Sequence, residues 1–179
     1  MIRLALAATA FTAMALPAFA QDALCFQNDT ALVIAEERTE DVGMNILARA
    51  PAKGKIKCEY EEREGDWVIG KVDDPLWYEG LLGKYLVLTR STGPDGNLVI
   101  YDLETQGLFL DEPVDDDIVL NETEVTFWQR FEDGTAENCP EFEEYASNGL
   151  GAVIAKEQVF DTTMGTLTGT GEERCSATQ

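Results

Sequence analysis

Short β-type runs separated by turn residues are the feature of this sequence that most restricts its fold. KYLVLTRS (84–91) and NLVIYDLE (97–104) flank a Pro-Asp-Gly turn at 94–96, in which proline fixes φ and glycine accepts a positive φ. Both runs are apolar at nearly every position, as in central strands that are covered on both faces. The segment therefore predicts a central β-hairpin. It lacks the lysine and the following helix of a phosphate-binding loop.

The rest of the chain repeats this pattern. Apolar or alternating runs occupy 30–37, 44–50, 55–62, 66–72, 117–120, 124–131, 151–163 and 165–175. In KIKCEYEE (55–62), Ile56, Cys58 and Tyr60 alternate with charged residues, which predicts a strand that buries Cys58. We expect this strand to form a hairpin with 66–72, and the runs 117–120 and 124–131 to form another.

Residues 73–83 interrupt the pattern. DDPLWYEGLLG contains Pro75 and two glycines, which exclude a long helix, but it is too apolar for a free linker. We expect a packed loop or a short helical turn that lays Trp77 and Tyr78 on the core. An aromatic platform for a ligand is the alternative.

One helix is predicted, in NCPEFEEYASNG (138–149). Pro140 suits the first turn of this helix, and Asn148 with Gly149 can close it in a left-handed conformation. Together with about nine or ten short strands, this pattern predicts an all-β fold. We expect an antiparallel β-sandwich or small barrel with one short helix near 140–147.

The first 20 residues have the pattern of a signal peptide. Arg3 precedes an apolar run at 4–16, and Ala18-Phe19-Ala20 fits a small-residue cleavage site. A membrane anchor is the alternative, but the apolar run is too short to cross a bilayer. We expect cleavage between Ala20 and Gln21, which leaves a single all-β domain at 21–179 in the periplasm or outside the cell.

Four cysteines in an exported chain indicate two disulfides. Three connectivities are open, and the favoured one is Cys25–Cys58 with Cys139–Cys175, because each bond then ties one end of the chain to its own half. A metal or redox site is disfavoured, since no two cysteines have CxxC spacing and the sequence has no histidine.

Composition excludes several classes of function. Without histidine there is no Ser-His-Asp triad, no Cys-His dyad and no histidine general base. The formal net charge of −21 repels nucleic acid and anionic lipid, and it attracts basic proteins or peptides. The sequence therefore predicts a non-catalytic binding module without a cofactor, in an inhibitor-like or chaperone-like role.

The predicted binding surface is an acidic face formed by residues 111–144, in which thirteen acids accompany one base, Arg130. Electrostatic attraction would bring a basic protein or peptide to this face. Its predicted partner-binding residues are Asp111, Glu112, Asp115, Asp116, Asp117, Glu122, Glu124, Glu141, Glu143 and Glu144.

Two other functions remain as alternatives. Asp115, Asp116 and Asp117 form a loop that could coordinate calcium through carboxylate oxygens, although the spaced D-x-D-x-D-G pattern of an EF-hand loop is missing. A hydrolase that uses two facing carboxylates is the less favoured alternative, because a chain with 34 acids brings some pair close in any fold.

Overall fold

The computed structural model describes residues 23–115 and 117–179, and these form an almost entirely β structure. The expected signal peptide, its cleavage point and Asp116 lie outside the described residues. The elements are β1 (Leu24–Gln27), β2 (Leu32–Glu37), β3 (Met44–Arg49), β4 (Trp67–Ile69), β5 (Leu76–Leu82), β6 (Tyr85–Ser91), β7 (Gly96–Asp102), β8 (Gly107–Val114), β9 (Val119–Leu120), β10 (Glu124–Asp133), α1 (Phe142–Ser147), β11 (Gly151–Asp161) and β12 (Thr166–Thr178).

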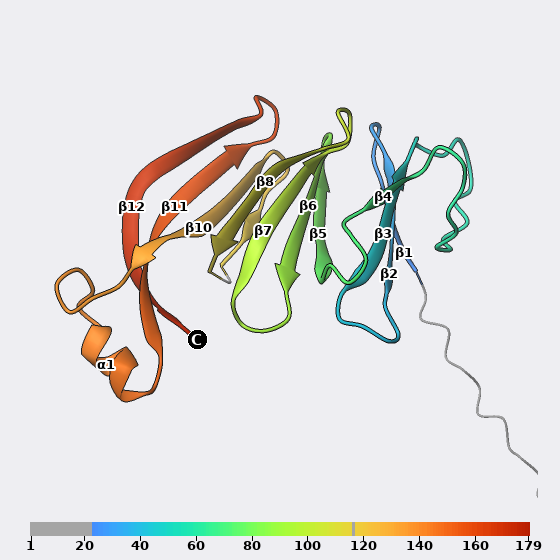
Figure 1. Ribbon diagram of the computed structural model, residues 1–179. Coiled ribbons are helices and arrows are strands. Elements are labelled where there is room, and N and C mark those ends of the chain that lie inside the picture. The colour runs from blue at the N-terminus through green and yellow to red at the C-terminus, as the bar shows by residue number, and fades with distance from the viewer. Residues whose placement is uncertain (1–22, 116) are drawn as a thin grey trace, which may run out of the picture.

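The strands form two antiparallel sheets, which confirms the predicted all-β class. Strands β1 to β4 make a small sheet in chain order, and β5 to β8, β10, β11 and β12 follow one another in a larger sheet, with β9 paired to β10. Neighbours in the chain are thus neighbours in the sheets, because short turns connect antiparallel strands. Figure 1 shows the small sheet lying beside β5 at one end of the larger sheet.

The two sheets pack against each other through the central hairpin that the sequence predicts. Leu86 and Leu88 of β6 contact the small sheet, where they join Val33 and Ile46 in one cluster. Val87, which alternates with them, belongs to a second cluster on the opposite face. The hairpin β6–β7 is therefore buried on both faces, which explains why its strands are apolar at successive positions.

The second cluster forms because the larger sheet folds back on itself. A single pair, Gln129 with Val114, joins β10 to β8. Phe127 of β10 and Phe160 of β11 pack with Val87 of β6 and with Leu98 and Ile100 of β7, which face away from the small sheet. The Tyr85 and Phe160 rings meet edge to face at 4.9 Å, a favourable geometry for aromatic pairs.

The predicted strand at 55–62 is wrong. This segment has no regular structure and crosses the outer face of the small sheet, where Ile56 and Tyr60 pack against β2 and β3. Arg49 holds it by donating hydrogen bonds to the Glu61 carbonyl oxygen and the Asp66 carboxylate at 2.7 and 2.8 Å. The Cys25–Cys58 disulfide also ties the segment to β1. The alternation of residues at 55–62 therefore reflects local contacts with the sheet and not a strand.

The predicted hairpin between 55–62 and 66–72 is wrong for the same reason. β4 pairs with β3, with Ile69 opposite Ile46. Cys58 is also exposed, against the prediction that it is buried.

The predicted loop at 73–83 is wrong as well, because β5 occupies most of it. Pro75 directly precedes this strand, where its missing N–H costs no ladder bond. A β-bulge between Tyr78 and Gly80 accommodates Glu79, which has no partner residue in the strand register with β6. Trp77 and Tyr78 pack against the core cluster between the sheets, and the Tyr78 ring stacks on Phe26 at 3.7 Å, so these aromatic residues serve packing.

A positive φ is predicted for glycine at two turns, Gly96 and Gly149, and only Gly149 has one. Gly149 has φ of 74° and closes α1 as predicted. Gly96 is not left-handed and begins β7. A side chain there would meet the Arg90 carbonyl oxygen at 2.9 Å, so close approach of the backbone, and not a positive φ, calls for glycine.

Both disulfides are present in the structure, in the pairing that the sequence favours. Cys25 is bonded to Cys58, and Cys139 is bonded to Cys175. The first ties segment 50–66 to β1, and the second ties the start of the α1 region to β12. Two such bonds indicate an oxidising environment outside the cytoplasm. No helix in the described residues is long and apolar enough to cross a membrane.

Candidate functional site: a paired charge network and an acidic pole

The Asp115 carboxylate is the centre of a charge network that the fold assembles from distant segments. Asp115 is only 5% exposed. Its Oδ1 accepts a hydrogen bond from Arg130 Nε at 2.9 Å, and its Oδ2 accepts one from Arg174 Nη2 at 2.9 Å. Arg174 also binds Asp117 at 2.6 Å. A buried carboxylate needs such partners, because an unpaired charge in the interior is strongly unfavourable.

The network extends to the turn between β6 and β7. Arg130 Nη2 lies 2.6 Å from Asp95 Oδ1. The other oxygen of Asp95 accepts hydrogen bonds from the Thr178 hydroxyl at 2.8 Å and the Gln179 N–H at 3.2 Å. Asp95 therefore ties the central hairpin to the end of β12, which Figure 1 shows returning to this turn.

These contacts keep the network ionised. Burial alone would raise the pKa of Asp115, but hydrogen bonds from Ser176, Arg130 and Arg174 outweigh it and lower that pKa below its usual value. The pKa of Asp95 is lowered in the same way, against its own burial, by Thr178 and Arg130. Both groups thus stay charged at neutral pH.

A third arginine, Arg90, also pairs with two aspartates. Arg90 binds Asp74 through Nε at 2.7 Å and Asp111 through Nη1 at 2.5 Å. Asn97 donates a further hydrogen bond to Asp111 at 2.7 Å. The hydrogen bonds that Arg90 donates to the two aspartates, above all the one to Asp74, raise the pKa of Arg90. Its guanidinium is therefore held between two carboxylates.

The predicted acidic face divides into two groups. Asp111, Asp115 and Asp117 belong to the internal pairs just described, and Glu112 accepts a hydrogen bond from Gln129 at 3.0 Å. The other described residues of the face are exposed: Glu122, Glu124, Glu141, Glu143 and Glu144. Arg90 and Arg174 lie 21 and 59 residues from their aspartate partners, so no local signal in the sequence reveals the pairing.

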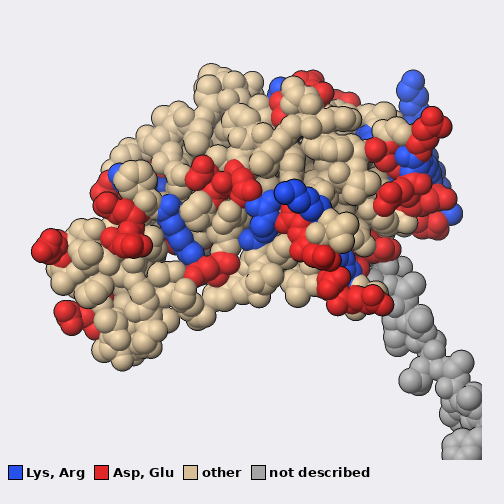
Figure 2. Space-filling view, viewed as in Figure 1, with Lys and Arg blue, Asp and Glu red and all other residues tan. Residues whose placement is uncertain are grey.

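A distinct surface, which we call the acidic pole, surrounds α1. It consists of Glu132, Asp133, Glu137, Glu141, Glu143 and Glu144, all of them exposed. None of these six carboxylates forms an ion pair within the described part of the chain, and residues 131–155 contain no lysine or arginine. Figure 2 shows acidic side chains without basic ones at the α1 end of the visible face.

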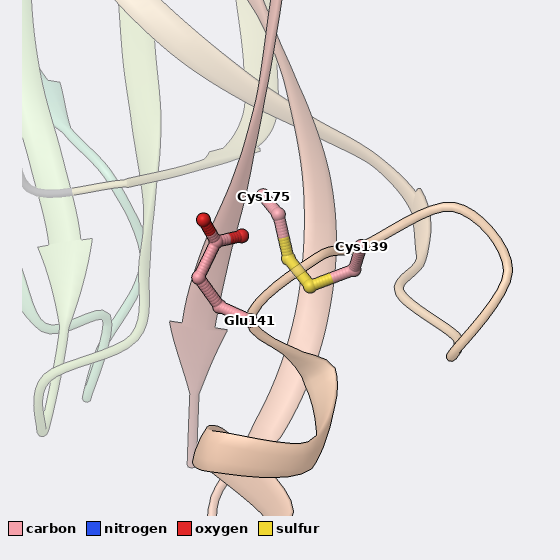
Figure 3. Close-up of side chains that lie close together, drawn as sticks. All are labelled: Cys139, Glu141 and Cys175. Atoms are coloured by element: carbon pink, nitrogen blue, oxygen red, sulfur yellow. A yellow bond between two sulfur atoms is a disulfide. The ribbon is translucent and has the colours of Figure 1, made fainter.

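The acidic pole rests on a fixed support. Phe142 and Tyr145 of α1 pack against Ile154 and the Cys139–Cys175 disulfide. Figure 3 shows the Glu141 carboxylate beside this disulfide, with ligand-type atoms of the three residues within 4.8 Å of one another. The two sulfurs are bonded to each other, so neither is a thiolate that could bind a metal. Glu141 is exposed at the surface beside the disulfide.

The ion pairs of Asp115 and Asp117 disfavour calcium binding at the expected loop. Both oxygens of Asp115 accept hydrogen bonds from arginines, and Asp117 is paired with Arg174. Guanidinium groups thus occupy both oxygens of Asp115 and one oxygen of Asp117, so a cation bound by Asp115 would have to displace them. The third residue of the expected calcium loop, Asp116, lies outside the described residues.

Comparisons with family models, with curated proteins and with solved structures found no match for this chain.

Proposed function

We propose that the protein is an exported, non-catalytic binding module that captures a basic protein or peptide through the acidic pole. The observation that carries this proposal is the contrast between two sets of acids. Those near Asp115 are neutralised by arginines inside the fold, whereas the six at the pole have no such partners. Unpaired carboxylates on a rigid support attract a cationic surface at long range and meet it without first breaking internal pairs.

The export pattern at residues 1–20 and the two disulfides support a periplasmic or secreted location. Basic proteins in that compartment include lysozymes, so an inhibitor-like role fits the charge of the pole. A chaperone-like role toward basic chains fits it equally.

A carboxylate hydrolase is less well supported. Such an enzyme needs one carboxyl group with a raised pKa to act as the acid. In the described residues, every carboxyl group with a shifted pKa is shifted downward, by arginine or lysine partners or by hydrogen-bond donors nearby: Glu61, Asp95, Asp102, Asp111, Asp115 and Asp161. The absence of histidine agrees with a binding role.

The test is binding of the mature, oxidised protein to a basic lysozyme, with cytochrome c as a second cationic probe, at low salt. A variant that combines Glu141→Gln, Glu143→Gln and Glu144→Gln removes three charges from the pole. A matched control, Glu40→Gln, Glu62→Gln and Glu64→Gln, removes three exposed charges from elsewhere on the chain.

We expect the pole variant to weaken binding about tenfold and the control to change it less than about twofold. Equal losses in the two variants would mean that only the overall charge matters. That result, or no binding of either probe at low salt, would overturn the proposal.

A further inference from the structure

A groove with apolar walls lies between the loop at 70–75 and the strands β7 and β8. Its volume is about 580 Å³. Trp67 and Tyr101 line it, with their rings edge to face at 5.6 Å, and both also pack against the core cluster between the sheets. The core therefore holds these two aromatic side chains in place before any ligand arrives, which lowers the entropic cost of binding.

The rim of this groove exposes aliphatic side chains that the fold does not use. Val72 is 89% exposed, Leu108 is 54% exposed and Val68 is 43% exposed, and all three line the groove. Scattered exposed apolar residues are ordinary, but a group of them around one concavity next to aromatic residues marks an interaction site. The groove is thus shaped to receive an apolar side chain.

The net charge of the groove, like that of the whole chain, favours a cationic ligand over an anionic one. Asp73, Asp74 and Asp111 line it together with Lys71 and Arg90, which leaves one net negative charge. Arg90 is held by two carboxylates, at 2.7 Å from Asp74 and 2.5 Å from Asp111. Its guanidinium is therefore taken up by these carboxylates. Asp73 and Lys71, both exposed, can meet charged groups of a ligand.

The groove continues along the same face as an extended track. Arg90 also lines a shallower concavity of about 320 Å³ that reaches Asp95 and Arg130, and these two residues line the cleft of about 360 Å³ at Arg174. Over the three concavities, six aspartates accompany four bases. Figure 2 shows basic and acidic side chains intermixed across the middle of this face. A track of this kind suits an extended chain.

We infer that this groove docks an extended peptide segment in which an apolar side chain stands next to a basic one. The apolar side chain occupies the space between Trp67, Tyr101 and Leu108, and the basic side chain meets Asp73 at the rim. This site is separate from the acidic pole, and the inference does not rest on the function proposed for the pole.

The experiment uses the mature, oxidised protein and three short acetylated, amidated peptides of equal length. One alternates lysine with leucine, the second alternates lysine with glycine, and the third alternates glutamate with leucine. Binding is followed by calorimetry and by the fluorescence of the tryptophans. The test variant combines Val72→Ser and Leu108→Ser. The control combines Val119→Ser and Met164→Ser, which are 54% and 70% exposed outside the groove.

We expect the lysine–leucine peptide to bind at least about tenfold more tightly than the other two. Only this peptide combines apolar side chains for the apolar lining of the groove with positive charges for its net negative charge. The groove variant should lose this preference, and the control should keep it. The pole variant Glu141→Gln, Glu143→Gln and Glu144→Gln should also keep it, which separates this site from the pole. Equal binding of the lysine–glycine peptide, equal losses in the groove and control variants, or no binding of the lysine–leucine peptide would each overturn the inference.

Discussion

The Arg174 guanidinium donates a hydrogen bond at 2.9 Å to the buried carboxylate of Asp115, 59 residues earlier in the chain. Arg130 binds the other oxygen of the same carboxylate. This arrangement joins β12, β10 and the end of β8 at one point. It also removes Asp115 from the acidic surface that the sequence predicts. The acids around α1 stay exposed and form no ion pair in the described part of the chain.

Asp115→Asn should destabilise the protein more than Asp117→Asn does. The first substitution removes a charge that is buried against two arginines, and the second removes one that is 67% exposed. We expect a loss of about 2–3 kcal/mol for Asp115→Asn and less than about 1 kcal/mol for Asp117→Asn. Urea unfolding measures both, and equal losses would show that burial of Asp115 contributes nothing.

Stability should fall in acid because the network loses its charge. The folded-state pKa values of Asp95 and Asp115 are lowered below those of the unfolded chain. Their contribution is therefore present above the unfolded pKa of about 3.9 and is lost as pH falls through the lower, folded values. Melting temperatures from neutral pH down to about pH 3 should drop below about pH 4. The drop should be smaller in Asp115→Asn, and an identical drop in that variant would contradict this assignment.

Calcium should leave the melting temperature unchanged. Arginines bind both oxygens of Asp115 and one oxygen of Asp117, and calcium at Asp115 would have to break the ion pairs of a buried carboxylate. Differential scanning fluorimetry with and without about 1 mM calcium checks this, since a bound ion stabilises the folded state by mass action. A rise of several degrees that chelation reverses would support the calcium alternative instead.

Removal of the Cys139–Cys175 bond should destabilise the protein and loosen the acidic pole. The bond spans 36 residues, and the loop-entropy model assigns such a loop about 3–4 kcal/mol. In Cys139→Ser with Cys175→Ser, we expect a lower melting temperature and faster proteolysis between β10 and β11 at temperatures where the sheets remain folded. Cleavage that starts elsewhere in the chain would show that the bond does not hold this region.

The sequence predicts the hairpins of this fold better than its surface chemistry. The strands at 84–91 and 97–104 are recognisable because burial on both faces demands apolar residues at every position. The alternation at 55–62 does not mark a strand, because Ile56 and Tyr60 reach the small sheet from a segment without regular structure. Pro75 and Gly80 do not prevent β5, because they lie just before the strand and at its bulge, where a strand tolerates them.

The pattern of apolar and polar residues in a sequence does not reveal ion pairs between residues that are far apart in the chain. The acids at 111–117 lie close together in the sequence and look like an unpaired tract, but the folded sheets bring Arg90, Arg130 and Arg174 to them. The acids around α1 follow Arg130 in the sequence, and in the described structure Arg130 pairs with Asp95 and Asp115 and not with them. No lysine or arginine occurs at 131–155, so there the sequence and the fold agree.

The salt dependence of lysozyme binding tests the central claim most directly. Between about 0.01 and 0.15 M salt the Debye length falls from about 30 to about 8 Å, so an interaction carried by exposed charges must weaken steeply. The account predicts a steep loss of affinity for the wild-type protein and for the Glu40→Gln, Glu62→Gln and Glu64→Gln control. It predicts a clearly shallower loss when Glu141, Glu143 and Glu144 are all replaced by glutamine. Affinity that does not change with salt, or the same slope in all three proteins, would contradict capture by the acidic pole.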